Sequence, residues 1–257
     1  MRQTATIVKQ IDHLLIACRD PQALYALFTE RLGLPVTWAM REMGDFVSGG
    51  VFCGNVDLEF LKLKATDDFT ALHGIAFEPS PLEQSIPELA TRGIAAQASV
   101  PFEGTLPDGT QGVLWRNVTL PWFLGESMIF LCARAPYAKE RRARLEASFN
   151  GGALGIKGMQ CVMVGTTDLN RARQKWDDLL DPVPIRDSAT WKAGAGPAIT
   201  LVEHPCNLLV RLEIAVESLA TARGFLAGND LLGEASSTEL TLKPAAVDGL
   251  DIRFVAT

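Results

Sequence analysis

Two of the three histidines in this chain occupy matching positions. His13 and His73 each lie on a short apolar run of strand length, a few residues before the helix starts Asp20-Pro21 and Ser80-Pro81. A single histidine on a strand is usually a hydrogen-bonded core residue. Two histidines at equivalent places instead predict imidazoles that converge on one site, where they could bind a divalent cation.

A carboxylate is the third candidate ligand. Glu59 stands in the middle of an otherwise apolar predicted strand. Burying an ionised carboxylate without a partner is costly, so Glu59 needs a cationic group beside it. A divalent metal would satisfy that need, and His13, Glu59 and His73 together form a two-histidine, one-carboxylate set suited to Fe(II), Mn(II) or Zn(II). The alternative is an ion pair of Glu59 with Arg41 or Arg116.

The elements that would position these residues repeat along the chain. A predicted strand, a helix and further short strands cover residues 11–63 and return over 72–133. Two more irregular copies cover 159–203 and 209–255. Each copy has a predicted helix cap after its opening strand: Asp20, Ser80, Asp168 and Ser218.

Each copy is a βαβββ module with one sheet face that it cannot cover alone, so modules are expected to pair around a concave cavity. The sequence therefore predicts an α+β fold in which four βαβββ modules form two barrel-like domains. Modules one and two would make an N-terminal domain of residues 1–137, and modules three and four a degenerate C-terminal domain of residues 156–257. Residues 138–155 are predicted to be a linker that contains a solvated helix.

These motifs resemble those of the vicinal oxygen chelate superfamily, which includes glyoxalases, bleomycin-resistance proteins and extradiol dioxygenases. The similarity rests on the opening strand Ile11-Asp12-His13-Leu14, the strand pair over residues 49–60, and His73 at the start of the second module. It covers residues 7–135 in motif and spacing, and residues 156–257 only in module order. The resemblance implies a cavity in which both histidines and Glu59 bind one divalent cation.

One ligand position of that family is not matched. Members with four protein ligands carry another carboxylate or amide on the closing strand of the second module, and residues 127–134 contain no Glu, Asp, Gln or His. Glu126, at the edge of this strand, is the candidate catalytic carboxylate, and Cys132 is a soft-ligand candidate. The sequence therefore predicts a three-ligand site closer to the extradiol dioxygenase pattern than to the glyoxalase I pattern.

Substrate contacts are predicted from the strands around this site. Arg116 would anchor an anionic oxygen and act as a catalytic residue. Trp115, Trp122 and Phe52 would stack on an apolar or aromatic substrate. The alternative is that these aromatic side chains belong to the core.

Composition excludes several classes of protein. The chain has a formal net charge of −6 and no long basic run, so no nucleic-acid partner is expected. It has no apolar stretch long enough for a membrane span and no signal peptide, which predicts a cytoplasmic protein. Five scattered cysteines indicate neither disulfides nor a zinc-thiolate site. The oligomeric state stays open between monomer and homodimer.

The favoured function is a metal-dependent enzyme that chelates two neighbouring oxygens of a small molecule on one divalent cation. Dioxygenase, lyase and isomerase chemistry all fit this description. The alternative is a protein of the same fold that binds a drug or metabolite without catalysis. A third hypothesis is a structural module whose second domain mediates association.

Overall fold

The computed structural model describes residues 5–63, 69–182, 185–187 and 189–257. The first two modules follow the predicted order. Their elements are β1 (Val8–Ala17), α1 (Pro21–Ala26) continuing into η1 (Leu27–Arg31), β2 (Val36–Glu42), β3 (Phe46–Phe52) and β4 (Asp57–Leu63), then β5 (Ala71–Pro79), α2 (Leu82–Thr91), β6 (Val100–Thr105), β7 (Gln111–Thr119) and β8 (Met128–Arg134).

The helix α3 (Pro136–Ser148) and the short turn η2 (Gly152–Leu154) lead to the second half. There the third and fourth modules comprise β9 (Ile156–Thr166), α4 (Leu169–Leu180), β10 (Ile185–Asp187), β11 (Thr190–Trp191), β12 (Ala198–Glu203), β13 (Leu208–Val216), α5 (Leu219–Gly228), β14 (Leu232–Ala235), β15 (Glu239–Leu242), η3 (Pro244–Ala246) and β16 (Ile252–Ala256). The predicted α+β fold of four βαβββ modules is confirmed. None of the helices in the described residues has the length and apolarity needed to span a bilayer.

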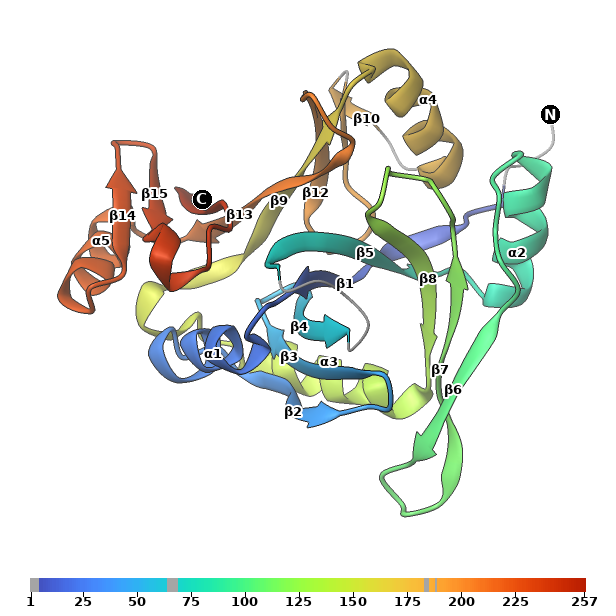
Figure 1. Ribbon diagram of the computed structural model, residues 1–257, viewed down its shortest axis with the longest axis horizontal. Coiled ribbons are helices and arrows are strands. Elements are labelled where there is room, and N and C mark those ends of the chain that lie inside the picture. The colour runs from blue at the N-terminus through green and yellow to red at the C-terminus, as the bar shows by residue number, and fades with distance from the viewer. Residues whose placement is uncertain (1–4, 64–68, 183–184, 188) are drawn as a thin grey trace.

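The strands form two sheets with the same internal order. In the first sheet the order is β2-β3-β4-β1-β5-β8-β7-β6, and in the second it is β10-β11-β12-β9-β13-β16-β15-β14. Within each sheet the two opening strands pair antiparallel at the centre, and each is flanked by the closing strand of its own module. Both sheets curl (Figure 1). The first sheet therefore surrounds a concave space with residues of both its modules.

Local chemistry explains the helix starts. The Asp20 carboxylate accepts a hydrogen bond from the backbone N–H of Ala23 at the start of α1, and Pro21 occupies the first turn. Asp168 caps α4 and Ser218 caps α5 in the same way. These three predicted caps are confirmed. The fourth predicted cap, Ser80, is wrong, because helix α2 begins after Pro81 and has no side-chain cap.

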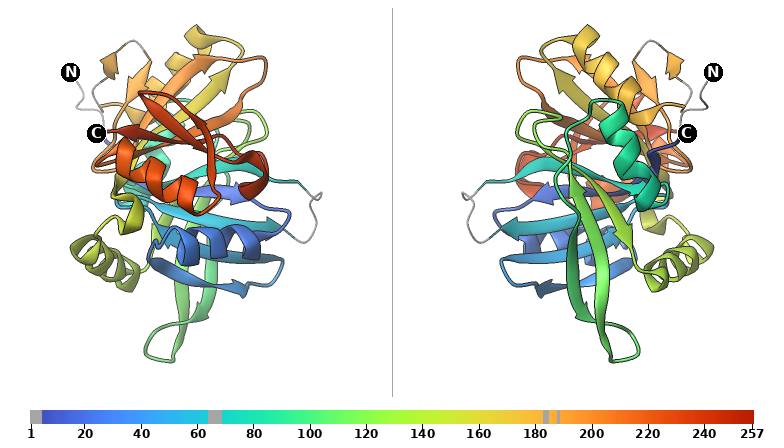
Figure 2. Two further views of the ribbon diagram at one scale, coloured as in Figure 1. Left: turned by 90° about the vertical axis from the view of Figure 1, so that its left-hand side faces the viewer. Right: turned by 90° about the vertical axis from the view of Figure 1, so that its right-hand side faces the viewer.

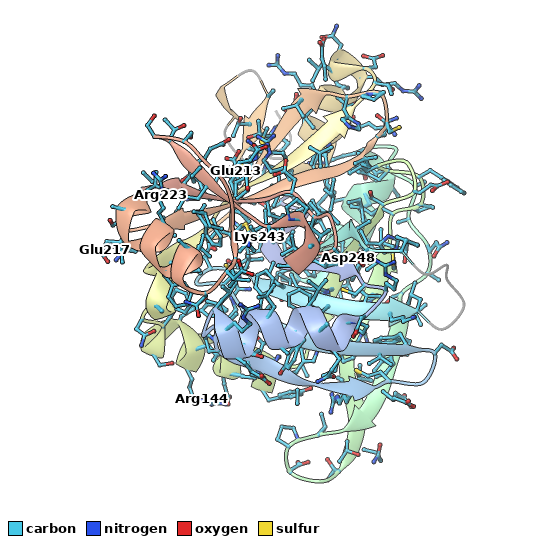
Figure 3. The ribbon with its side chains drawn as sticks, turned by 60° about the vertical axis from the view of Figure 1, so that its left-hand side comes forward. Arg144, Glu213, Glu217, Arg223, Lys243 and Asp248 are labelled. Carbon is cyan, nitrogen blue, oxygen red and sulfur yellow. The ribbon has the colours of Figure 1, made fainter. Side chains whose placement is uncertain are left out.

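The two halves pack closely on each other (Figure 2). The rings of Phe77 in β5 and Trp176 in α4 lie 6.3 Å apart between centroids. The side chain of Asn55 bonds both the N–H and the C=O of Met159. Arg19 of the first half forms an ion pair with Asp248 of the second. Figure 3 labels Asp248. One apolar core therefore extends through both halves. The predicted boundaries between the N-terminal domain, the linker and the C-terminal domain, at 137/138 and 155/156, remain a prediction.

Helix α3 falls largely within the predicted linker and is more than a connector. Most of its residues are exposed, but Arg142 reaches inward and donates hydrogen bonds to the backbone oxygens of Asp12 and Asn55, at 3.2 and 2.5 Å. Lys139 forms an ion pair with Glu78 of β5 at 3.1 Å. These contacts hold α3 against the central strands β1 and β5 and the turn between β3 and β4.

Candidate functional site

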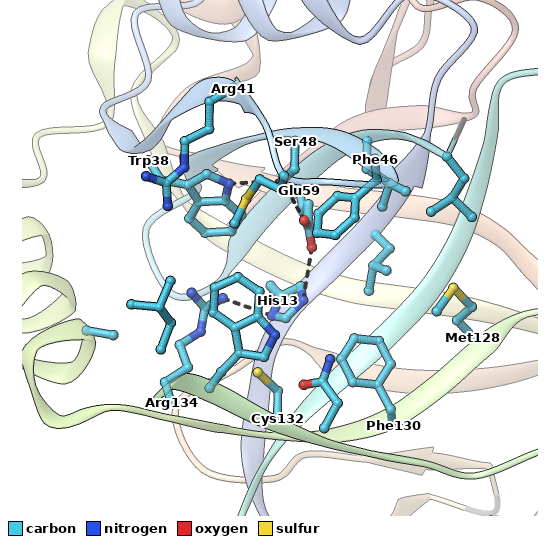
Figure 4. A pocket seen from close by; sticks show the side chains of 18 of the residues that line it. His13, Trp38, Arg41, Phe46, Ser48, Glu59, Met128, Phe130, Cys132 and Arg134 are labelled. Carbon is cyan, nitrogen blue, oxygen red and sulfur yellow. Dashed lines mark hydrogen bonds and ion pairs between the residues drawn. The ribbon is translucent and has the colours of Figure 1, made fainter. Parts of the chain in front are cut away.

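A cavity lies within the curl of the first sheet (Figure 4). The cavity and the solvent-open space at its mouth together take up about 910 Å³. Its walls are mostly apolar and aromatic, and they include Leu61, Trp115, Met128 and Phe130. Polar and charged side chains gather around His13 at one end.

His13 is buried on β1 between two carboxylates. Its Nδ1 lies 2.6 Å from Oδ2 of Asp12, and its Nε2 lies 3.1 Å from Oε2 of Glu59 on β4. A register shift between Ile11 and His13, where β1 pairs with β5, brings the neighbouring side chains of Asp12 and His13 together. Both ring nitrogens of His13 therefore have an acidic partner.

Glu59 is fixed by a chain of hydrogen bonds across β3 and β2. The hydroxyl of Ser48 donates to Oε1 of Glu59 at 2.5 Å, and the indole N–H of Trp38 donates to Ser48 Oγ at 3.0 Å. The free side of the carboxylate faces His13 and the cavity (Figure 4).

The guanidinium of Arg134 contacts Asp12 and His13 on the side of this network opposite Glu59. Nε of Arg134, the last residue of β8, donates to the same Oδ2 of Asp12 at 2.6 Å. An Arg134 Nη lies 3.0 Å from His13 Nδ1. The raised pKa of His13 favours the imidazolium, in which Nδ1 donates a hydrogen bond to Asp12. In that form Arg134 and His13 are two cations that share one anion.

The titration behaviour of these groups follows from the contacts. Burial alone would lower the pKa of His13, but hydrogen bonds to Asp12 and Glu59 raise it above its ordinary value. Burial alone would raise the pKa of Glu59, but the bond and charge of His13 and the bond from Ser48 lower it. The pKa of Asp12 is also lowered, chiefly by Arg134 and His13, which outweigh burial. The network therefore favours an imidazolium between two carboxylates.

His73 is not among the residues that line the cavity. It lies at a register shift in β5, and its ring contacts Phe69 with 6.1 Å between centroids. The residue of β5 that pairs with His13 is Ala76. At about 3.3 Å per residue, His73 lies roughly 10 Å along the strand from that position. Since the ligands of one ion lie about 2 Å from it, His73 is not assembled with His13 and Glu59.

A second group of potential ligands does not replace the predicted one. The ligand atoms of Asp12, His13 and Cys132 lie within 4.8 Å of one another. However, Asp12 is already bonded to the guanidinium of Arg134, whose positive charge opposes a second cation. Burial raises the pKa of the Cys132 thiol, so the thiol is protonated when no metal ion lies beside it.

On the cavity side of the network, the imidazole and carboxylate ligand atoms among the described residues are Nε2 of His13 and Oε2 of Glu59. The amide of Asn117 and the thiol of Cys132 also belong to residues that line the cavity. Facing His13 and Glu59, β8 contributes the apolar side chains of Met128 and Phe130. Structural and catalytic metal sites of this kind normally use three or four protein ligands. Without His73, the histidine and carboxylate ligands therefore fall short of the predicted set of three.

The three aromatic residues predicted to contact substrate lie in different places: one in the cavity wall, one in the protein core and one on the surface. Trp115 lines the cavity and stacks on Phe102 with 4.2 Å between centroids. Phe52 is fully buried outside the cavity lining, and its ring packs on Phe149. Trp122 is 79% exposed. Trp115 is thus the one predicted aromatic contact that lies in the cavity wall.

The predicted catalytic residues Arg116 and Glu126 are exposed and do not line the cavity. Arg116 lies on β7 between Trp115 and Asn117, which both line it. Because side chains alternate along a strand, Arg116 points to the opposite face. Glu126 lies in the turn before β8.

Sequence reasoning assigned no role to Asp12, Ser48, Arg134 or Arg141. Asp12 had a usable signal, because an acidic residue beside His13 on an apolar strand needs a partner. Arg134 looked like an ordinary polar strand end. Arg141 lies in the charged segment interpreted as solvated, yet it lines the cavity from α3.

No family model matches the sequence, and no curated protein matches it. Solved structures do match its fold. A hypothetical protein from Staphylococcus aureus superposes with a TM-score of 0.64 at 9% identity, over 96% of this chain and 99% of that one. A variant of homoprotocatechuate 2,3-dioxygenase from Brevibacterium fuscum superposes with a TM-score of 0.62 at 11% sequence identity, and the match covers 100% of this chain and 74% of that one. The 2,3-dioxygenase LapB from Pseudomonas sp. KL28 superposes with a TM-score of 0.59 at 11% sequence identity, and the match covers 98% of this chain and 93% of that one.

Proposed function

We propose, from the vicinal oxygen chelate fold that this chain shares with those dioxygenases, that its N-terminal cavity is an enzyme site for a small oxygen-bearing molecule. In this proposal His13 and Glu59 move a proton on the bound molecule, and no resident metal ion takes part. The observation that carries the proposal is the 3.1 Å contact of Nε2 and Oε2 at the polar end of an apolar cavity.

The two groups are suited to opposite roles. The pKa of His13 is raised and that of Glu59 is lowered, so one is poised as a proton donor and the other as a proton acceptor. Hydrogen bonds from Ser48 to Glu59 and from His13 to Asp12 fix both groups in place. The apolar walls exclude water, which strengthens electrostatic interactions within the site.

The proposed step is a proton shift within one molecule. Glu59 accepts a proton from an acidic O–H or C–H group, and His13 donates its Nε2 proton to an oxygen of the same molecule. For a hydroxy-ketone the product of this step is an enediol. Glu59 then gives its proton to the other carbon of the enediol, and His13 recovers a proton from the other hydroxyl group, which restores the site and forms the isomer. Such an isomerisation needs no oxidant or reductant.

A metal-dependent enzyme is the second candidate, and one observation favours it. Two neighbouring ligands of one cation, each about 2.1 Å from it, lie roughly 3 Å apart, which is also the separation of His13 Nε2 and Glu59 Oε2. Asp12 would then orient the imidazole through Nδ1, as carboxylates do behind metal-bound histidines. The ion could be Fe(II), Mn(II) or Zn(II), with water completing its coordination.

Metal quantification separates these candidates. We expect protein purified without oxygen to contain far less than one equivalent of Fe, Mn or Zn, and ligand binding to survive a chelator. One equivalent of metal that is lost in both His13→Ala and Glu59→Ala would contradict the metal-free site. The matched control is Glu126→Gln, because Glu126 is exposed outside the cavity.

Proton transfer is tested directly with a panel of small hydroxy-ketones and hydroxy-acids in D₂O. The wild-type protein should catalyse deuterium incorporation into at least one member, as seen by NMR. Glu59→Gln should lower that rate by about a hundredfold or more, while Glu126→Gln leaves it unchanged. If no member exchanges but members bind, the protein is a non-catalytic binder.

A further inference from the structure

Two residues that line the cavity each carry a buried polar atom with no hydrogen-bond partner among the described residues. The atoms are Oδ1 of Asn117 on β7 and Nε of Arg141 on α3. In folded proteins nearly all buried polar atoms are paired, with protein, water or ligand. An acceptor and a donor left free in one cavity indicate a molecule that supplies the opposite groups.

The charges around Arg141 point to an anion. Its guanidinium lies 5.8 Å from the ring of Trp38, and that of Arg134 lies 5.0 Å from the same ring. Arg134 has Asp12 as its counter-ion. Within the described part of the chain, Arg141 forms no ion pair, and burial together with Arg134 lowers its pKa. Arg141 is therefore a cation in need of a negative partner.

The other cavity groups limit the kind of anion. Two guanidiniums that line the cavity form no ion pair among the described residues: that of Arg41, which is exposed, and that of Arg141, whose Nε is buried. The buried one can compensate a single negative charge. Glu59 at the polar end would repel a dianion such as a phosphate monoester. A carboxylate suits both conditions, since its two oxygens match the guanidinium.

We propose that the cavity binds a planar, largely apolar monocarboxylate whose carboxylate lies on Arg141 and whose hydrogen-bond donor lies on Asn117. The indoles of Trp38 and Trp115 and the ring of Phe130 contact its body. This inference rests on the proposed function and adds the class of substrate. It also gives α3 a role in binding the carboxylate, through Arg141, whereas the sequence predicted this segment only as a linker.

Calorimetric titration with 4-hydroxybenzoate and its neutral isostere 4-hydroxybenzamide tests the carboxylate. The wild-type protein should bind the carboxylate about tenfold more tightly than the amide. In Arg141→Gln this preference should disappear, with the affinity for the amide unchanged. Arg144→Gln should keep the full preference, because Arg144 is exposed on the same helix (Figure 3).

Asn117 is tested with benzoate as the second probe. The wild-type protein should prefer 4-hydroxybenzoate to benzoate, and Asn117→Ala should abolish this preference. Arg141→Lys provides a second variant in case Arg141→Gln does not fold. It keeps the charge but lacks Nε, so it should weaken carboxylate binding several-fold and leave amide binding unchanged.

The outcomes separate this inference from the proposed function. Equal binding of carboxylate and amide by the wild-type protein would overturn the anion site and leave the small-molecule cavity intact. Binding of the carboxylate that is unaffected in Arg141→Gln would overturn the assignment to Arg141. If none of the three probes binds at millimolar concentration, the inferred monocarboxylate site is wrong, and the deuterium-exchange experiment decides the proposed function separately.

Discussion

Oδ2 of Asp12 lies 2.6 Å from Nδ1 of His13, its neighbour in sequence. Consecutive residues of a regular strand point to opposite faces, so this contact depends on the register shift in β1. The same oxygen accepts a hydrogen bond from Arg134. One carboxylate oxygen thus joins the opening strand of the first module to the closing strand of the second.

Removing the charge of Asp12 should destabilise the protein strongly. Asp12→Asn leaves Arg134 buried without its counter-ion, and breaking a buried ion pair costs about 3–5 kcal/mol. We expect the free energy of unfolding, measured in urea, to fall by about 3 kcal/mol. Asp45→Asn, at an exposed position, should change it by less than about 0.5 kcal/mol. Similar values for both variants would show that the Asp12 pair is not structural.

His73 should be dispensable for ligand binding. It does not line the cavity and contacts the ring of Phe69. We expect His73→Ala to bind a carboxylate probe with wild-type affinity and His13→Ala to bind it at least several-fold more weakly, in calorimetric titrations. Equal losses in the two variants would restore the predicted pairing of the histidines in one site.

Much of the fold could be predicted because its signals are local. Asp20 and Ser218 cap helices through bonds that reach only three residues along the chain. The repeat of strand, helix and strands follows from such signals and from short apolar runs. The contact between halves, as at Phe77 and Trp176, depends on packing that no local pattern records.

The site was predicted in part for the same reason. His13 and Glu59 were recognised because each is a polar residue on an apolar strand, and they do meet. His73 has the same pattern, but the register of β5 against β1 places Ala76 opposite His13. Register is set by pairing across the sheet, so the spacing from His73 to its helix start could not reveal the difference.

Phe52 and Trp122, both predicted to contact substrate, should respond in opposite ways. Phe52 is fully buried, and Phe52→Ala should lower the free energy of unfolding by about 3–5 kcal/mol through the cavity that it leaves. Trp122 is 79% exposed, and Trp122→Ala should change it by less than about 1 kcal/mol. Unfolding of the two variants in denaturant measures both changes in the free energy of unfolding. A large loss of probe affinity in folded Trp122→Ala would contradict the assignment of Trp122 to the surface.

The contact of α3 with the first sheet should weaken in acid through Glu78. One oxygen of this carboxylate lies 3.1 Å from both Lys9 and Lys139, and the other accepts a hydrogen bond from Gln10 at 2.8 Å. Burial alone would raise its pKa, but Lys139, Lys9 and Gln10 lower it below the ordinary value of 4.5. The unfolded chain therefore binds the proton more tightly than the folded protein does, and stability rises with pH through this range.

Glu78→Gln isolates this contribution. Because both lysines are exposed, the free energy of unfolding of the wild-type protein should exceed that of the variant by only about 1 kcal/mol at neutral pH. The stabilisation is fully present above the unfolded pKa and is lost as the pH falls through the lower folded pKa. The difference between the two unfolding free energies should therefore shrink between about pH 5 and pH 3. Exposed Glu83, changed to Gln, should show no such trend, and a pH-independent difference for Glu78→Gln would exclude the ion pairs as its cause.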